Sequence, residues 1–224
     1  MDIIIDEIIR SRRKTIALQV FHDARLIVRV PFSTSEKLIK KVIHEKRLWI
    51  LTKQEQAKEK YKKVYSKEFV NGEGFLFLGN SYKLYIVDNC EFSLIFNNEN
   101  FFLSKKFLNK AKDVFIKWYK EQSYKKFLER VEFYSKVSGI TYNKLKITNA
   151  RKRWGSCSSK GNLNFTWRLI MAPLQVIDYV IVHELVHIKE KNHSKNFWNN
   201  VRIILPYYKT QKKWLKENGH LLIL

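Results

Sequence analysis

Hydrophobic and polar residues alternate along most of the first hundred positions, which is the pattern of half-buried β-strands. Two alternating runs, Thr15–Phe21 and Arg25–Val30, predict a pair of strands joined by a tight turn at residues 22–24. Two further pairs of short strands are predicted, with turns after residue 78 and after residue 96. Their ranges are Phe75–Leu78 with Tyr82–Val87, and Phe92–Phe96 with Phe101–Leu103.

One long helix is expected among these strands. Ser33 and Glu36 have the spacing of a capping box, and apolar residues then recur at helical intervals to about Lys63. Because Lys and Glu occupy most of the remaining positions, one face of this helix is expected to be buried. The first part of the chain is therefore mainly antiparallel β with one long helix.

From about residue 104 the hydrophobic pattern changes to a helical period. A helix is expected from Ser104 to Ser138, where Gly139 is suited to end it. Three short strands and three helices follow. The strands are Lys144–Thr148, Arg153–Cys157 and Asn162–Trp167, and the helices are Pro173–Lys189, a segment from Ser194 to before Pro206, and Lys209–Glu217.

This change of pattern predicts an α+β protein with a boundary near residue 105. Residues 1–104 form the β-rich region with one long helix, and residues 105–224 form a helical region with a small mixed sheet. A chain of 224 residues is long enough to bury a sizeable core without disulfide bonds or a structural metal.

The net positive charge of the chain indicates an anionic binding partner. Lys and Arg number 43 and Asp and Glu 21, giving a net charge of +22, of which +17 lies in residues 105–224. With 45% hydrophobic residues the chain is not a disordered polycation. An anionic partner such as nucleic acid, a nucleotide phosphate or an acidic lipid surface is expected, unless the charge serves only solubility.

Several classes of protein are excluded. The longest stretch without Asp, Glu, Lys or Arg is Leu169–Ile177, which is too short to span a bilayer, so no membrane partner is expected. Asp6 and Glu7 interrupt the apolar start that a signal peptide would need. Cys90 and Cys157, the two cysteines, exclude a disulfide framework and a four-thiolate zinc site. A cytoplasmic location is therefore expected.

The strongest chemical signal is an HExxH motif in the helix predicted over Pro173–Lys189. His183 and His187 are four residues apart, so on a helix both imidazoles point to the same side and can bind one zinc ion. Glu184 can reach a water molecule on that metal without binding the metal itself, which makes it a general base. The neighbouring apolar residues indicate a buried helix.

A third metal ligand has to come from outside this helix. His193 follows His187 by six residues and can return to the metal if the helix ends near Glu190 and the chain turns at Asn192. The alternatives are that an acidic residue, Glu190 or Glu217, is the third ligand. Three protein ligands would leave the fourth position open, as in catalytic zinc sites. Manganese, cobalt or nickel would also suit these ligands.

Motifs along nearly the whole chain resemble the YgjP-like metallopeptidases, relatives of the SprT and WLM zinc proteases. The matching segments are Arg10–Lys14, Trp49–Ile50, Arg153–Ser158, Trp167–Ile170 with Ala172–Pro173, Asp178–His187, Asn192–Ser194, Phe197–Trp198, Leu205–Pro206, Tyr208 and Trp214–Leu215. The resemblance implies a zincin-like, gluzincin-type catalytic core with zinc on His183, His187 and His193 and with Glu184 as the base.

Substrate-binding residues are less sharply defined. Trp154, Gly155 and Ser156 are expected on a strand along the cleft, where glycine would let an extended peptide approach; a packed tryptophan beside a turn glycine is the alternative. Arg168 is expected either to pair with Asp178 or to stabilise the oxyanion. The other candidates for the oxyanion are Tyr207 and Tyr208, and Cys157 is not expected to be a nucleophile.

Hydrolysis of peptide bonds is the expected activity. A nucleoside triphosphate pyrophosphatase acting on UTP is the alternative that enzymes resembling this family imply; its phosphates would be held by basic residues. These are Arg12, Arg13, Arg151, Lys152, Arg153 and Arg168. A SprT-like protease acting on DNA-associated protein is a further alternative. A nucleic-acid-binding protein with structural zinc is disfavoured, because such a site needs no base.

Overall fold

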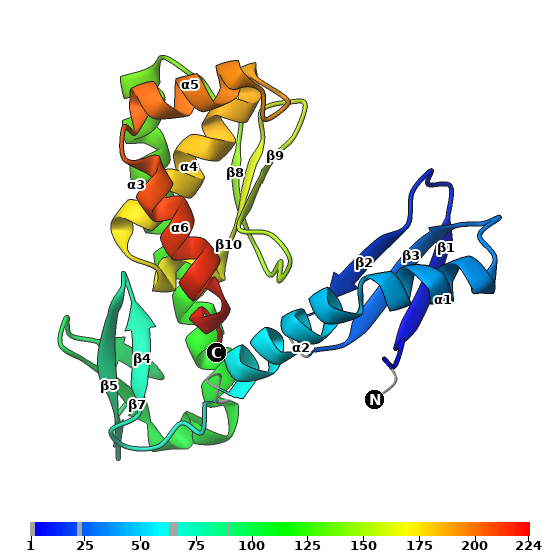
Figure 1. Ribbon diagram of the computed structural model, residues 1–224. Helices are drawn as coiled ribbons and strands as arrows, with labels where there is room; N and C mark the ends of the chain where they lie inside the picture. The colour runs from blue at the N-terminus through cyan, green and yellow to red at the C-terminus, as the bar shows by residue number, and fades with distance from the viewer. Residues whose placement is uncertain (1–2, 22–23, 63–66, 89) are drawn as a thin grey trace. The chain divides into compact units, whose positions relative to one another are not determined.

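The computed structural model describes residues 3–21, 24–62, 67–88 and 90–224 (Figure 1). It confirms the expected α+β class, with helices and three small sheets. The chain forms two compact units, residues 1–65 and residues 66–224. No described helix has the length and apolar character that crossing a membrane requires.

The first unit is a three-stranded sheet packed on helices. Its strands are β1 (Glu7–Ser11), β2 (Ala17–Val20) and β3 (Leu26–Pro31), and its helices are α1 (Glu36–Glu45) and α2 (Arg47–Lys62). The central strand β3 is parallel to β1 and antiparallel to β2. Its alternate residues Leu26, Val28 and Val30 are fully buried against the helices.

Three details of this unit differ from expectation. Strand β1 was not predicted, because it is an edge strand whose residues are exposed or only half-buried. The long helix is divided at Lys46, which leaves the helical conformation. The N-cap is Ser35, whose Oγ accepts from the Leu38 amide at 3.3 Å, so the pair Ser33 and Glu36 is not the capping box. The turn near residues 22–24 and the helix end near residue 63 lie partly outside the described residues.

The second unit begins with a four-stranded sheet in the order β4-β5-β7-β6. Its strands are β4 (Gly74–Phe77), β5 (Asn80–Val87), β6 (Leu94–Phe96) and β7 (Asn100–Ser104). Pairs β4–β5 and β6–β7 are the two antiparallel hairpins expected, whereas β5 and β7 pair in parallel. The sheets of the N-terminal half are thus mixed, each with one parallel pair.

This second sheet shares its core with the helical part of the chain. Phe75 of β4 stacks on Phe115 of the following helix, with ring centroids 4.2 Å apart. The turn after β4 is also anchored there, because the amides of Leu78 and Gly79 donate to the carbonyls of Ile170 and Met171. The compact units therefore do not follow the expected boundary at residue 105. The strands before residue 105 and the helices after it pack into one hydrophobic core.

The remaining elements form the part that carries the HExxH motif. The 3-10 helix η1 (Lys105–Lys110) leads into α3 (Ala111–Ser138), which ends at Gly139 in the left-handed conformation, φ 64°. Strands β8 (Leu145–Thr148), β9 (Gly155–Cys157) and β10 (Leu163–Thr166) follow, in the order β8-β10-β9. Strand β9 is therefore at an edge of this sheet and pairs with β10 alone among the described strands.

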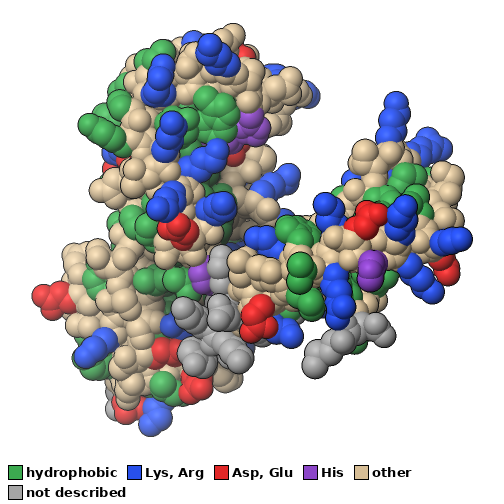
Figure 2. All heavy atoms as spheres, in the orientation of Figure 1, with side chains coloured by type: hydrophobic (Ala, Val, Ile, Leu, Met, Phe, Trp, Pro, Cys, Tyr) green, Lys and Arg blue, Asp and Glu red, His purple; other side chains and the backbone are tan. Residues whose placement is uncertain are grey.

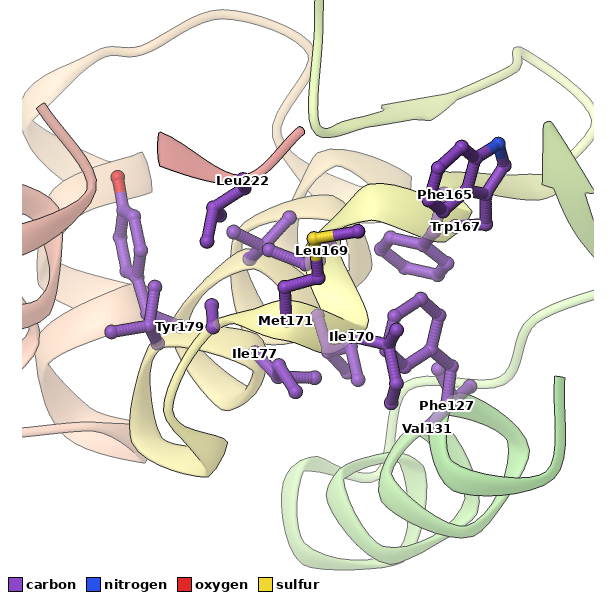
Figure 3. Close-up of a cluster of buried hydrophobic side chains, with 14 of the residues drawn as sticks. Phe127, Val131, Phe165, Trp167, Leu169, Ile170, Met171, Ile177, Tyr179 and Leu222 are labelled. Carbon is purple, nitrogen blue, oxygen red and sulfur yellow. The ribbon is translucent and has the colours of Figure 1, made fainter. Parts of the chain in front are cut away.

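Helix α4 (Leu174–Lys189) has ten buried residues and lies between α3, β9 and the last helices, α5 (Lys195–Ile204) and α6 (Tyr208–Asn218). The 3-10 helix η2 (Trp167–Met171) precedes it. Figure 3 shows the core around it, where side chains of η2, α3, α4 and β10 meet. The residues drawn include Phe127, Val131, Phe165, Trp167, Leu169, Ile170, Met171, Ile177, Tyr179 and Leu222.

Candidate metal centre

Three histidine side chains meet at one point beside α4. His183 and His187 lie one helical turn apart on α4, and His193 lies in the loop between α4 and α5. The Nε2 atom of His193 is 3.0 Å from Nε2 of His183 and 3.2 Å from Nε2 of His187. The helical spacing sets the first two rings, and the loop brings the third ring over them.

The loop makes this turn without a left-handed residue. Helix α4 ends at Glu190, which is extended at φ −115° and ψ 100°. The Ser194 amide then donates to the Asn192 carbonyl at 2.8 Å, which tightens the chain around His193. Asn192 is not among the described residues with positive φ, so the expected left-handed turn there is not the one used.

The three rings rest on one aromatic side chain. Phe197 of α5 is fully buried, and its ring centroid lies 4.5–4.9 Å from those of His183, His187 and His193. His187 is further fixed by its Nδ1, which donates to the Glu190 carbonyl at 3.0 Å. With Nδ1 protonated, a neutral His187 has its lone pair on Nε2, where it can bind a metal ion. Metal-binding histidines commonly donate their other ring N–H to a carbonyl or carboxylate in this way.

The geometry and protonation of the histidines fit a metal ion. Two nitrogens bound to a tetrahedral zinc at about 2.0–2.1 Å are separated by about 3.3 Å, which is close to the Nε2 separations here. Burial, together with the two neighbouring imidazoles, lowers the pKa of His183 to about 3, so this ring is neutral at pH 7. Of the described residues, His183, His187 and His193 form the group that could hold a metal ion, and neither Glu190 nor Glu217 joins them.

Glu184 lies next to this cluster with its carboxyl group enclosed. Its exposed fraction is 6%, and burial raises its pKa to about 7, while the charge of Arg153 acts in the opposite direction. Strand β9 runs past it at Gly155, where a Cβ atom would lie 2.6 Å from Glu184 Cγ and 2.7 Å from Oε1. The space that Gly155 provides is thus occupied by the glutamate side chain.

The residues around Gly155 are placed by packing and by the β9 edge. Trp154 is half-buried and lies against Gly219, where a Cβ atom would come within 2.8 Å of the indole. Ser156 Oγ accepts from the side-chain amide of Asn164 on β10 at 3.4 Å. Arg153 is exposed and contributes a positive charge near Glu184. Burial raises the pKa of Cys157, which disfavours a thiolate nucleophile.

The expected pairing of Arg168 with Asp178 is wrong. Arg168 lies over the Trp167 ring at 4.3 Å and donates to the side-chain oxygen of Asn149 at 2.9 Å. Asp178 accepts two hydrogen bonds from Arg130 of α3, at 2.7 and 2.8 Å. Helix α4 is therefore tied to α3, through a residue 48 positions earlier in the chain.

The two tyrosines expected near the oxyanion differ strongly in environment. Tyr207 is 79% exposed, whereas Tyr208 is 7% exposed and stacks on Trp198 at 5.3 Å. The same Trp198 ring stacks on His193 and carries Lys212 Nζ 4.0 Å from its centroid. Sequence reasoning gave no role to Trp198 or Lys212. The signal available for Trp198 is its position in the first turns of the helix that follows His193.

Comparison with known proteins identifies the family. No curated protein matches the chain. Two metallopeptidase zymogens of known structure are each similar to 42% of this chain. Abylysin of Pyrococcus abyssi is 19% identical, with 95% of the abylysin chain covered and a TM-score of 0.38. Jannalysin of Methanocaldococcus jannaschii is 22% identical, with 96% of the jannalysin chain covered and a TM-score of 0.36. The family model of the YgjP-like metallopeptidase domain matches residues 14–218. The chain therefore belongs to the YgjP-like metallopeptidase family.

Proposed function

We propose that the protein is a zinc-dependent peptidase in which His183, His187 and His193 hold the metal and Glu184 is the general base. One observation carries this proposal: three imidazole Nε2 atoms converge next to an enclosed carboxyl group. Three nitrogen ligands leave a position open for substrate or water, which is the arrangement of catalytic rather than structural zinc sites. Membership of a metallopeptidase family supports the same reaction.

Each residue of the site has a separate role in the proposed hydrolysis. A divalent metal ion at this site would polarise the scissile carbonyl and make water more acidic. Glu184 follows the first ligand on α4 and, in this proposal, takes a proton from the attacking water. It can then deliver that proton to the nitrogen of the departing amine. Gly155 leaves the room that this carboxyl group occupies, since a Cβ atom there would lie 2.6–2.9 Å from three atoms of Glu184.

The edge of β9 is suited to bind the peptide. Among the described strands β9 pairs with β10 alone, so no described strand pairs with its other edge. An extended substrate can add to such an edge as a further strand. Since Gly155 of this strand contacts Glu184, a peptide on this edge would pass directly beside the base.

The proposal is tested by Glu184→Gln. This change keeps the size of the side chain and the three histidines, so the purified variant should retain one zinc per chain. Loss of the base should lower the rate of peptide hydrolysis by at least about 100-fold. Zinc content is measured by elemental analysis and turnover with a fluorescent casein. A variant that cleaves casein at the rate of the unchanged protein would rule out Glu184 as the base.

The substrate class needs a parallel assay. The zinc-loaded protein is offered casein and, separately, a panel of nucleoside triphosphates including UTP. Cleavage of casein that Glu184→Gln abolishes supports the peptidase. Release of pyrophosphate from a nucleotide, without peptide cleavage, would overturn the peptidase proposal in favour of a pyrophosphatase that uses the same site.

A further inference from the structure

The three histidines are not held equally well. His183 and His187 are half-buried residues on the rigid helix α4, and Nδ1 of His187 has a hydrogen bond to the backbone. His193 is exposed and lies in the loop between two helices. A metal site of three ligands depends on each ring being aimed at the metal, so the orientation of His193 needs a separate cause.

Two aromatic rings contact His193: Phe197 meets it edge-on at 4.8 Å, and Trp198 stacks on it face to face. The rings of His193 and Trp198 are nearly parallel, 23° apart in orientation and 5.7 Å apart in position. Trp198 is itself fixed by Tyr208 of α6, at 5.3 Å and 16°, and Tyr208 stacks on Tyr179 of α4, at 6.4 Å and 19°. A series of near-parallel rings thus connects the loop histidine to the same helix that carries the other two.

The start of α5 explains why these two rings meet. Ser194 is the N-cap of α5, and its Oγ accepts from the amide of Phe197 at 3.2 Å. His193 is therefore the residue before the cap and Trp198 the fourth residue of the helix. Side chains at these two positions commonly pack together and fix the direction in which the chain enters a helix. Here the same contact would fix the direction of a metal ligand.

We propose that Trp198 is a positioning residue for His193: it holds the imidazole ring in the orientation in which Nε2 faces the other two histidines. The inference rests on the proposed metal site. Because Trp198 has no atom suited to bind zinc, its effect on metal binding passes through His193. Loss of a residue that orients a metal-binding histidine typically weakens metal binding by about 10- to 100-fold.

A double-mutant cycle on zinc affinity tests this directly. Trp198→Leu removes the stacked ring but keeps an apolar side chain, and Trp198→Phe keeps a ring. Each is made in the full chain and also together with His193→Ala. The zinc dissociation constant is measured by competition with a chromophoric chelator, and the melting temperature of the zinc-free protein reports folding. Trp214→Leu is the matched control, since Trp214 packs on the same core and is not among the rings that contact His183, His187 or His193.

Trp198→Leu should weaken zinc binding about tenfold, and Trp198→Phe should recover most of that loss. In the His193→Ala background, Trp198→Leu should change the affinity less than about twofold, because the ligand it orients is already gone. Trp214→Leu should lower the melting temperature without changing zinc affinity. This pattern separates an effect through His193 from a general loss of packing.

Three results would overturn the inference, and they differ in what they imply for the site. Equal losses of affinity from Trp198→Leu with and without His193, or no loss in either, would show that Trp198 does not act through that histidine, and would leave the proposed peptidase site intact. Unchanged zinc affinity in His193→Ala alone would remove His193 from the metal site and overturn both proposals.

Discussion

At the residue scale, Gly155 on the edge strand β9 packs against Glu184, the proposed general base. Replacing Gly155 with Ala would place a methyl group 2.6–2.9 Å from three atoms of the glutamate side chain, so the carboxyl group must move. A displacement of about 1 Å at a catalytic group can lower the rate by about 100-fold. We expect Gly155→Ala to lower kcat for casein by about that factor while zinc content, measured by elemental analysis, stays at one per chain.

Gly139→Ala separates this effect from a loss of stability. Gly139 ends α3 at φ 64°, and a Cβ atom there would have no neighbour within 4 Å. The substitution should cost about 1 kcal/mol of unfolding free energy through backbone strain alone, with kcat unchanged. If Gly155→Ala lowers stability as Gly139→Ala does but leaves kcat alone, the close fit around Glu184 has no catalytic role.

Contacts between residues close together in the sequence could be predicted, and contacts between distant residues could not. The convergence of His183 and His187 follows from helical spacing, and the return of His193 follows from the end of that helix. The partner of Asp178 could not be found in this way, because Arg130 is 48 residues away and any of many basic residues would have satisfied the same charge. Trp198 was noted only as part of a matching segment, and its stack on His193 was missed because that contact forms only once the loop has turned.

At the scale of elements, the pair of Arg130 and Asp178 ties α3 to the helix that carries the motif. Asp178 is 7% exposed and accepts two hydrogen bonds from Arg130. Arg130→Met would leave a buried carboxylate without its charged partner, which should cost about 3 kcal/mol of unfolding free energy. Urea denaturation measures this loss. Replacing both residues, Arg130→Met with Asp178→Leu, should restore most of it, because no charge then remains buried.

Lys126→Met on the same helix is the control for this pair. Lys126 and Glu129 form an ion pair at 2.6 Å, but both side chains are well exposed, at 30% and 55%. Solvent-exposed pairs contribute little, so the change in unfolding free energy should stay below about 1 kcal/mol. Equal losses in Lys126→Met and Arg130→Met would mean that burial does not strengthen the link between α3 and α4.

Elements with a strong hydrophobic period could be predicted, and elements without one could not. Helix α4 has ten buried residues among its sixteen and a proline at its start, so its expected range, Pro173–Lys189, is close to Leu174–Lys189. Strand β1 gives no such signal, because an edge strand buries little of either face. The parallel pairing of β5 with β7 could not be predicted from the local sequence either. A hairpin turn predicts only that the two strands it joins are antiparallel.

At the scale of the whole molecule, hydrophobic contacts define units that the order of elements conceals. One buried cluster draws only on residues 26–50, and the other draws on residues from Phe75 to Leu222. A boundary placed where strands give way to helices would cut through the second cluster, between Phe101 and Phe115, whose ring centroids are 5.3 Å apart. The basic residues, by contrast, are spread across the face drawn in Figure 2 and mark no boundary.

Since the larger cluster lies entirely within residues 66–224, that segment should fold without residues 1–65. It also contains the three histidines and the aromatic rings that hold them. We expect a fragment of residues 66–224 to unfold cooperatively in urea and to bind zinc within about twofold of the full chain, because no described ligand or packing partner of the site is lost. A fragment of residues 105–224, cut at the boundary that the sequence pattern favours, is the comparison; it lacks Phe75 and Phe101 and should be unfolded or strongly destabilised. If the shorter fragment folds and the longer one does not bind zinc, the sheet β4–β7 is not part of the core that supports the metal centre.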